Sequence, residues 1–180
     1  LGIYNAGTTI VTYTATDGAL NTAQCQITVT VVENILPTIT CPGNLSRTVG
    51  ADGTNNYTYT ATLAEISPIV ADNCTAVTVA GNVTYMAFGA TSALGTGAAT
   101  LSFNVGTTFI TYTVNDASGN TRQCSFSITV TDNLLPTITC PSNPVTDVTD
   151  LNTCNALVSI AVPTTADNCG VASVVNSYNN

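Results

Sequence analysis

The chain has 180 residues, of which 44% are hydrophobic and only 7% are charged, whereas an ordinary soluble domain carries about 25% charged residues. Ten acidic and two basic residues give a formal net charge of −8, so nucleic acid is a poor partner and a bound cation is a better one. With neither histidine nor lysine, the chain lacks the usual nucleophile–base pairs, His-zinc sites, Schiff bases and P-loops. We therefore expect no enzyme, because only paired carboxylates, as in glycosidases, remain for acid–base chemistry.

No apolar run approaches the roughly 20 residues of a membrane helix, so we expect no membrane insertion. The first residue is Leu1, with no signal peptide after it, so we expect a processed product or a window of a longer protein. Seven cysteines without C-x-x-C spacing indicate disulfides and hence an extracellular location, secreted or at the cell surface. The odd number leaves at least one thiol free or bonded outside this chain.

Strands are the elements that the sequence predicts along the chain. In residues 8–17, Val, Tyr and Ala alternate with Thr, and residues 107–116 repeat this pattern. In residues 124–131, Cys, Phe, Ile and Val alternate with Ser and Thr. A period of two predicts strands with one buried and one solvated face. The turn residues at 116–120 join two such runs and predict a β-hairpin.

Residues 87–99 are rich in Gly and Ala and show no strand alternation. We expect a long loop there, and a surface loop of this kind could also carry a subunit contact or a ligand site. Several short strands separated by Gly, Asn and Pro favour an antiparallel β-sandwich, and no stretch shows a helical apolar stripe.

An internal repeat organises the chain. Residues 5–42 and 104–141 align without gaps at an offset of 99, with 22 of 38 positions identical. A shorter match relates residues 69–74 to 164–169 at an offset of 95. The repeat predicts three parts: the C-terminal part of one unit at residues 1–35, a complete unit at 36–134 and the N-terminal part of the next at 135–180.

The repeated motif resembles the hyalin repeat, or HYR, domain. It runs from GTT-x-x-TYT-x-x-D-x-x-x-N at residues 106–120 through C-x-x-x-x-TV at 124–130 to PTITCP at 136–141. The DNC motifs at residues 72–74 and 167–169 are similar to bacterial versions. The resemblance implies tandem immunoglobulin-like β-sandwich modules with a repeat of about 99 residues. It also implies a role in cell adhesion, like that of bacterial (Bacteroidetes-type) secreted surface adhesins.

The resemblance also implies how the cysteines pair. Minimal HYR domains keep two cysteines, which correspond here to Cys41 and Cys124, so we expect these two to form a disulfide. Bacterial copies with four cysteines imply a second bridge, Cys154 to Cys169, in the last part of the chain. In the complete unit an asparagine stands where Cys154 would align, which leaves Cys74 without that partner.

A group of acidic residues surrounds the boundaries between units. Glu33 and Asp132 are equivalent in the repeat and stand shortly before Pro37 and Pro136. The end of one module should lie next to the loops of the following one, and clustered carboxylate and amide oxygens suit Ca²⁺. Local turn formation is the alternative role for such residues. The candidate calcium ligands are Glu33, Asp72, Asp116, Asp132 and Asn133.

We expect the chain to be a structural and adhesive segment of a secreted repetitive surface protein that forms an extracellular stalk or fibre. Its partners would be neighbouring repeats, or copies of itself whose incomplete ends complement each other, and a cell surface or polysaccharide. The alternative is a carbohydrate-binding β-sandwich module of a larger secreted protein; a glycosidase is a more remote one.

Overall fold

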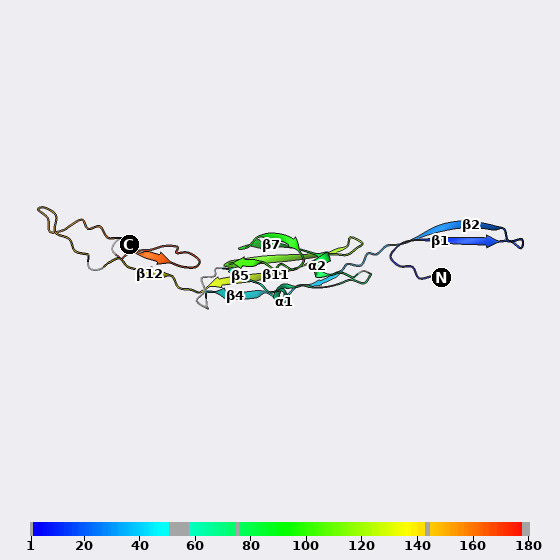
Figure 1. The fold of residues 1–180 in the computed structure, drawn as a ribbon, viewed down its shortest axis with the longest axis horizontal. Helices are drawn as coiled ribbons and strands as arrows, with labels where there is room; N and C mark the ends of the chain where they lie inside the picture. The colour runs from blue at the N-terminus through cyan, green and yellow to red at the C-terminus, as the bar shows by residue number, and fades with distance from the viewer. Residues whose placement is uncertain (1, 51–57, 75, 143–144, 178–180) are drawn as a thin grey trace.

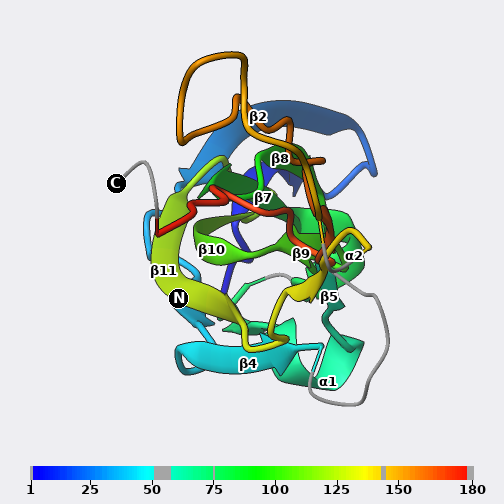
Figure 2. The same cartoon turned by 90° about the vertical axis from the view of Figure 1, so that its left-hand side faces the viewer.

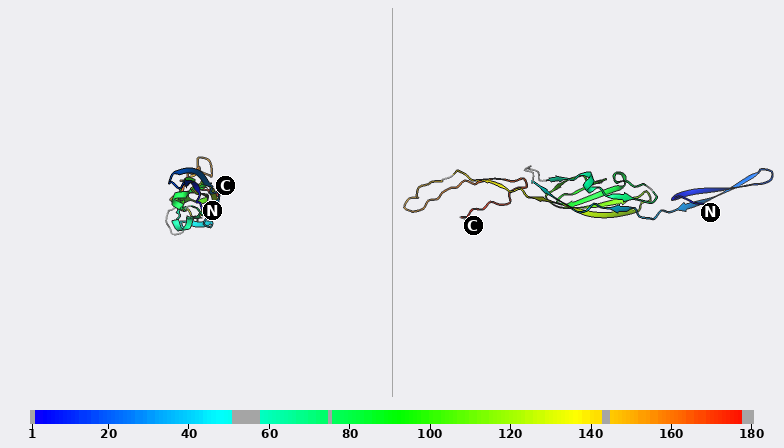
Figure 3. Two further views of the ribbon diagram at one scale, coloured as in Figure 1. Left: turned by 90° about the vertical axis from the view of Figure 1, so that its right-hand side faces the viewer. Right: turned by 90° about the horizontal axis from the view of Figure 1, so that it is seen from below.

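The computed structural model describes residues 2–50, 58–74, 76–142 and 145–177. These residues form three bodies in a row along one axis: an N-terminal hairpin, a central module and a C-terminal segment (Figure 1). Viewed along that axis, the three bodies overlie one another, and seen from the side they follow in chain order (Figure 3). The chain therefore enters the central module at one pole and leaves it at the opposite pole.

Strands make up most of the regular structure. Two helices, each of a single turn, also occur among the described residues: α1 (Leu63–Ile66) and α2 (Val79–Asn82). The strands are β1 (Gly7–Thr16), β2 (Thr22–Val31), β3 (Thr38–Thr40), β4 (Leu45–Val49), β5 (Thr58–Thr60), β6 (Ile69–Ala71), β7 (Val83–Gly89), β8 (Ala93–Thr96), β9 (Ser102–Asn104), β10 (Gly106–Asn115), β11 (Thr121–Asp132), β12 (Thr137–Thr139) and β13 (Thr164–Ala166).

The central module is an all-β sandwich, as the sequence predicts. A five-stranded sheet has the order β4-β11-β10-β7-β8, and the pairs β3–β6 and β5–β9 form the rest of the module. Seen end on, β4 and α1 lie on the side opposite β7 and β8 (Figure 2). One pair departs from the expected antiparallel arrangement, because β4 pairs with β11 in parallel. Both strands run from the entry pole to the exit pole, so a parallel pair follows when they are neighbours.

The hydrophobic core follows the predicted alternation of β10 and β11. The buried side chains of both strands are at most 5% exposed, whereas the other face carries mostly Thr and Ser, with Phe109 and Gln123 among them. They pack with Phe103 of β9 and Ile66 of α1, which are fully buried. The inward-facing residues are Thr108, Ile110, Tyr112, Val114, Phe126, Ile128 and Val130.

The N-terminal hairpin reproduces β10–β11 without its covering layer. Gly7 pairs with Val31, and Gly106 pairs with Val130 99 residues later. Tyr13 is 57% exposed, whereas its repeat equivalent Tyr112 is fully buried. The strands that cover Tyr112 come from residues 38–104, and β1–β2 has no such layer in the part of the chain that the structure describes.

The predicted loop at residues 87–99 is wrong, because most of this stretch lies in β7 and β8, which form an antiparallel hairpin. Small residues are needed there for packing: a Cβ added to Gly95 would meet the ring of Tyr85 at 2.6 Å. The absence of alternation therefore reflects a close approach of backbone and aromatic ring, and not a loop.

The C-terminal segment contains one short pair of strands. β12 pairs with β13 as β3 pairs with β6: Thr137 faces Ala166, and Thr38 faces Ala71. Between the two strands the described residues are mostly irregular and exposed. Within the described residues, no helix is long and apolar enough to span a membrane.

The cysteines surrounded by the hydrophobic core form a disulfide, whereas those outside it are free. Cys41, just after β3, and Cys124 of β11 form a disulfide that ties the two layers of the central module together. The bridge expected between Cys154 and Cys169 is not formed, since both thiols are free and exposed. Cys154 lies in a turn, and the described residues between β12 and β13 contain no strand that would hold it against the loop of Cys169.

Candidate functional site: the junctions between modules

The first junction joins the N-terminal hairpin to the central module. Glu33 follows β2 after one residue, and the linker then reaches the buried Pro37 and β3. Two loops of the central module meet this linker: the DNC loop at residues 72–74, and the β10–β11 turn at 116–120.

The β10–β11 turn is built around Asp116. Its Oδ1 accepts hydrogen bonds from the backbone N–H groups of Ser118 at 2.9 Å and Asn120 at 2.7 Å. The Nδ2 of Asn120 donates to Asp116 Oδ2 at 2.7 Å. Burial alone would raise the pKa of Asp116, but the hydrogen bonds from Asn120 hold that pKa below its ordinary value.

The same turn joins β1 to β2. Asp17 accepts from the backbone N–H groups of Ala19 and Asn21 at 2.9 Å each. Asn21 Nδ2 donates to Asp17 Oδ2 at 2.9 Å. One difference is that Leu20 has a φ of 69°, where the repeat has Gly119 at 89°, so Leu20 occupies a left-handed conformation that glycine accepts more readily.

The linker acid Glu33 contacts this turn from outside. Asn120 Nδ2 lies 2.7 Å from Glu33 Oε2, and it also lies 3.5 Å and 3.4 Å from the carbonyl oxygens of Glu33 and Ile35. Glu33 Oε1 accepts the backbone N–H of Ile35 at 2.6 Å. One carboxylate thus connects its own linker to the following module.

The DNC loop brings a thiol close to these acids. The Asp72 carboxylate accepts the backbone N–H of Cys74 at 3.1 Å. Partial burial raises the pKa of the Cys74 thiol, and so do the negative charges of Glu33, Asp72 and Asp116. A groove of about 740 Å³ opens beside this cluster, lined by Asn5, Ala6, Gly7, Val31, Val32, Glu33, Asn73, Cys74, Ala117 and Ser118.

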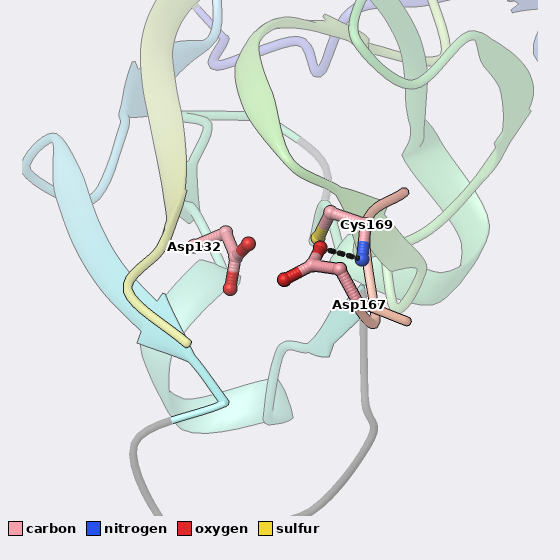
Figure 4. A group of neighbouring side chains, drawn as sticks. All are labelled: Asp132, Asp167 and Cys169. Atoms are coloured by element: carbon pink, nitrogen blue, oxygen red, sulfur yellow. Dashed lines mark hydrogen bonds between the residues drawn. The ribbon is translucent and has the colours of Figure 1, made fainter. Parts of the chain in front are cut away.

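The second junction contains an acid and a DNC loop that are equivalent to those of the first junction. Ligand atoms of Asp132, Asp167 and Cys169 lie within 4.8 Å of one another, with Asp132 at the end of β11 facing the loop that carries the other two (Figure 4). Asn168 Nδ2 donates to Asp132 Oδ1 at 3.3 Å, and Cys169 N–H donates to Asp167 at 2.8 Å. Hydrogen bonds, first that from the backbone N–H of Leu134, hold the pKa of Asp132 below its ordinary value.

The five predicted ligands thus divide between two junctions. Glu33, Asp72 and Asp116 meet at the first junction. Asp132 and Asn133 lie at the second, where Asn133 is exposed and donates its backbone N–H to Asp132. Sequence reasoning did not include Asp167 or Cys169 among the ligands, although the offset of 95 relates them to Asp72 and Cys74.

The donor sets of the two junctions differ in how closely their ligand atoms approach one another. At the first junction the Glu33 and Asp116 carboxylates face the same Asn120 amide, and Asp72 lies in the DNC loop beside the Cys74 thiol. Carboxylate oxygens suit a hard cation such as Ca²⁺. At the second junction two carboxylates are joined by a thiol, which is a ligand for softer metals. Among the described residues, the group whose ligand atoms lie within 4.8 Å of one another is Asp132, Asp167 and Cys169 at the second junction.

The fold and the junctions define a class of protein: a β-sandwich module joined to the strands on either side by short linkers with an acidic residue at or near their start. The HYR domain family model matches residues 3–31 and 32–130 of the chain. Because these ranges cover more than half of the chain, the protein belongs to the HYR domain family.

Two curated relatives are similar over nearly the whole chain. Hyalin of Strongylocentrotus purpuratus is 31% identical over 184 residues, and Hyalin of Lytechinus variegatus is 32% identical over 191 residues. Each alignment covers 98% of this chain but only 14% and 31% of the respective relative, so the chain spans a minor part of either protein. Neither relative is bacterial, and the resemblance to bacterial adhesins stays a prediction.

Proposed function

We propose that this chain is a structural and adhesive segment of a secreted, repetitive surface protein that forms an extracellular stalk or fibre. The observation that carries this proposal is the end-to-end order of the three bodies, with entry and exit at opposite poles of the central module (Figure 1). Membership of the HYR domain family and similarity to proteins named Hyalin support it. A structural role also agrees with a sequence that lacks histidine and lysine.

The junctions support a mechanical role. The linker between β2 and β3 has six residues, and Pro37 within it is buried. Short linkers with a proline have little slack. In an array of this kind each module contacts only its neighbours, so the junctions determine the stiffness of the whole.

Carbohydrate binding is a second candidate, supported by the solvent-facing side of the five-stranded sheet. Phe88 and Phe109 stack there with ring centroids 5.3 Å apart, although each is nearly half exposed. Threonines and Gln123 lie beside them on the same sheet. Ile10 stands at the repeat position of Phe109, so this aromatic pair is particular to the central module.

A stalk and a carbohydrate-binding module differ in two measurements on the full chain. For a stalk we expect small-angle X-ray scattering to give a rod-like profile. We also expect the chain to migrate equally fast in native gels with and without neutral polysaccharide. Retardation in such a gel that is lost in the double variant Phe88→Ala/Phe109→Ala would favour the carbohydrate-binding module. The scattering of a flexible chain would contradict a stalk.

We also propose that calcium binds at the first junction, through the carboxylates of Glu33, Asp72 and Asp116. Bound calcium would relieve the repulsion among three acids that have no lysine in the sequence to neutralise them. We expect millimolar Ca²⁺ to raise the melting temperature and EDTA to reverse this. The variant Glu33→Gln should weaken the response, whereas Asp147→Asn, which alters an exposed acid away from the junction, should keep it. Calorimetric titration without binding would leave turn formation as the role of these acids.

A further inference from the structure

We propose that the side-chain amide of Asn120 is a latch that fixes the angle between the N-terminal hairpin unit and the central module. Its Nδ2 lies 2.7 Å from Asp116 within its own turn and 2.7 Å from Glu33 across the junction. It also faces the Glu33 and Ile35 carbonyl oxygens at 3.5 Å and 3.4 Å. One nitrogen therefore faces both the turn and the linker.

Comparing the two copies of the turn shows which contacts of the asparagine side-chain amide belong to the turn and which belong to the junction. Asn21 makes the same turn with Asp17 at 2.9 Å, and the structure assigns no linker contact to it. In the described residues, the local hydrogen bonds of Asp17 and Asn21 form the turn with no acid like Glu33 beside it. The contact between Asn120 and Glu33 is an addition to a turn that is already complete, which is what a contact between modules requires.

The burial and the charge of the residues around Asn120 indicate that its contact with Glu33 affects the angle between the two units. Asp116 is 8% exposed, and Glu33 and Asn120 are half-buried. The two carboxylates approach the same nitrogen and would repel each other without a donor between them. The groove of about 740 Å³ leaves one side of the junction open, so apolar packing does not hold the two units together there.

The second junction supports the same principle with another residue. Asp132 is the repeat equivalent of Glu33, and it accepts from Asn168 of the DNC loop at 3.3 Å. At both junctions an asparagine amide of the following unit therefore contacts the acid that ends the preceding one. The acid, placed by the end of β2 or β11, is the common element.

The latch identifies the residues that set the angle between consecutive units of the proposed stalk. The inference rests on that function for its biological meaning, but its test measures distances and not adhesion. A failed latch would leave the stalk proposal standing with another source of stiffness, whereas a flexible scattering profile of the unaltered chain would remove both.

The latch is tested in the full chain by double electron–electron resonance, which measures the distance between two spin labels. The five free cysteines are replaced by serine, and labels are attached through Thr28→Cys on β2 and Thr96→Cys on β8, both exposed positions. We expect one narrow distance distribution for the parent and a clearly broader one for Asn120→Ala. The matched control Asn21→Ala removes the equivalent turn contact and should stay narrow.

A second variant covers the case in which Asn120→Ala disturbs its own turn. Glu33→Ala leaves the Asp116 turn intact and should broaden the distribution to the same extent. The double variant should be no broader than either single one, because all three remove one shared contact. Narrow distributions in both Asn120→Ala and Glu33→Ala would overturn the latch, as would equal broadening in Asn21→Ala.

Discussion

Replacing Cys41 and Cys124 together by serine is expected to destabilise the central module by about 4–5 kcal/mol. The disulfide joins residues 83 apart in the sequence, so it closes a long loop and removes much conformational freedom from the unfolded chain. Equilibrium unfolding in urea, followed by circular dichroism, measures this loss as a lower transition midpoint. Since typical domains are stable by about 5–15 kcal/mol, the reduced module should be only marginally folded.

Two other cysteines provide the matched control for this prediction. Cys25 is the repeat equivalent of Cys124, and Cys140 is that of Cys41, but both are free and exposed. The double variant Cys25→Ser/Cys140→Ser should therefore leave the transition of the central module unchanged. An unaltered midpoint in the Cys41→Ser/Cys124→Ser protein would show that the bridge does not contribute to stability.

The strands β10 and β11 could be predicted from sequence because each crosses the whole sandwich. A long strand with one buried face alternates over many positions, so its pattern is strong. The repeat then transferred the same prediction to β1 and β2 at an offset of 99. The pairs β3–β6 and β5–β9 have three residues per strand, too few to show a period.

The hairpin β7–β8 was missed for a different reason. Its Gly95 is adapted to one contact, the ring of Tyr85, and tertiary packing of this kind leaves no periodic pattern in the sequence. The second disulfide was wrongly expected because a motif shows which residue types are present but not whether a core surrounds them. Cys154 lies in a turn, and no strand is assigned between β12 and β13 in the described residues around it.

The junction was predictable from its acids but not from its amide. Glu33 and Asp132 recur at equivalent positions before a proline, and this repetition is visible in the sequence. Asn120 also recurs, as Asn21, but within a turn motif whose local hydrogen bonds explain its presence completely. Its contact with Glu33 bridges 87 positions of sequence, and such a separation becomes visible only when the sandwich brings the turn to the linker.

Tyr112 is the largest fully buried side chain among the described residues. Its ring is fully buried and stacks on Phe126 with centroids 5.8 Å apart. Its hydroxyl donates to the carbonyl oxygen of Ile66 at 2.8 Å and accepts the backbone N–H of Ala99 at 3.0 Å. Tyr112 thus connects the five-stranded sheet to α1 and to the stretch before β9. Among the described residues, this stretch belongs to no strand.

Changing Tyr112 to phenylalanine should therefore cost about 2–4 kcal/mol of folding free energy, although only one oxygen is lost. The variant keeps the ring but leaves a buried carbonyl and a buried N–H without a partner, and each such group costs about 1–3 kcal/mol. Urea unfolding measures the change, and Tyr13→Phe is its control. Tyr13 has the same repeat position but is 57% exposed, so its hydroxyl can exchange partners with water and its loss should change stability by under about 0.5 kcal/mol. Equal effects of the two substitutions would mean that the Tyr112 hydroxyl does not support the backbone of α1 and the stretch before β9.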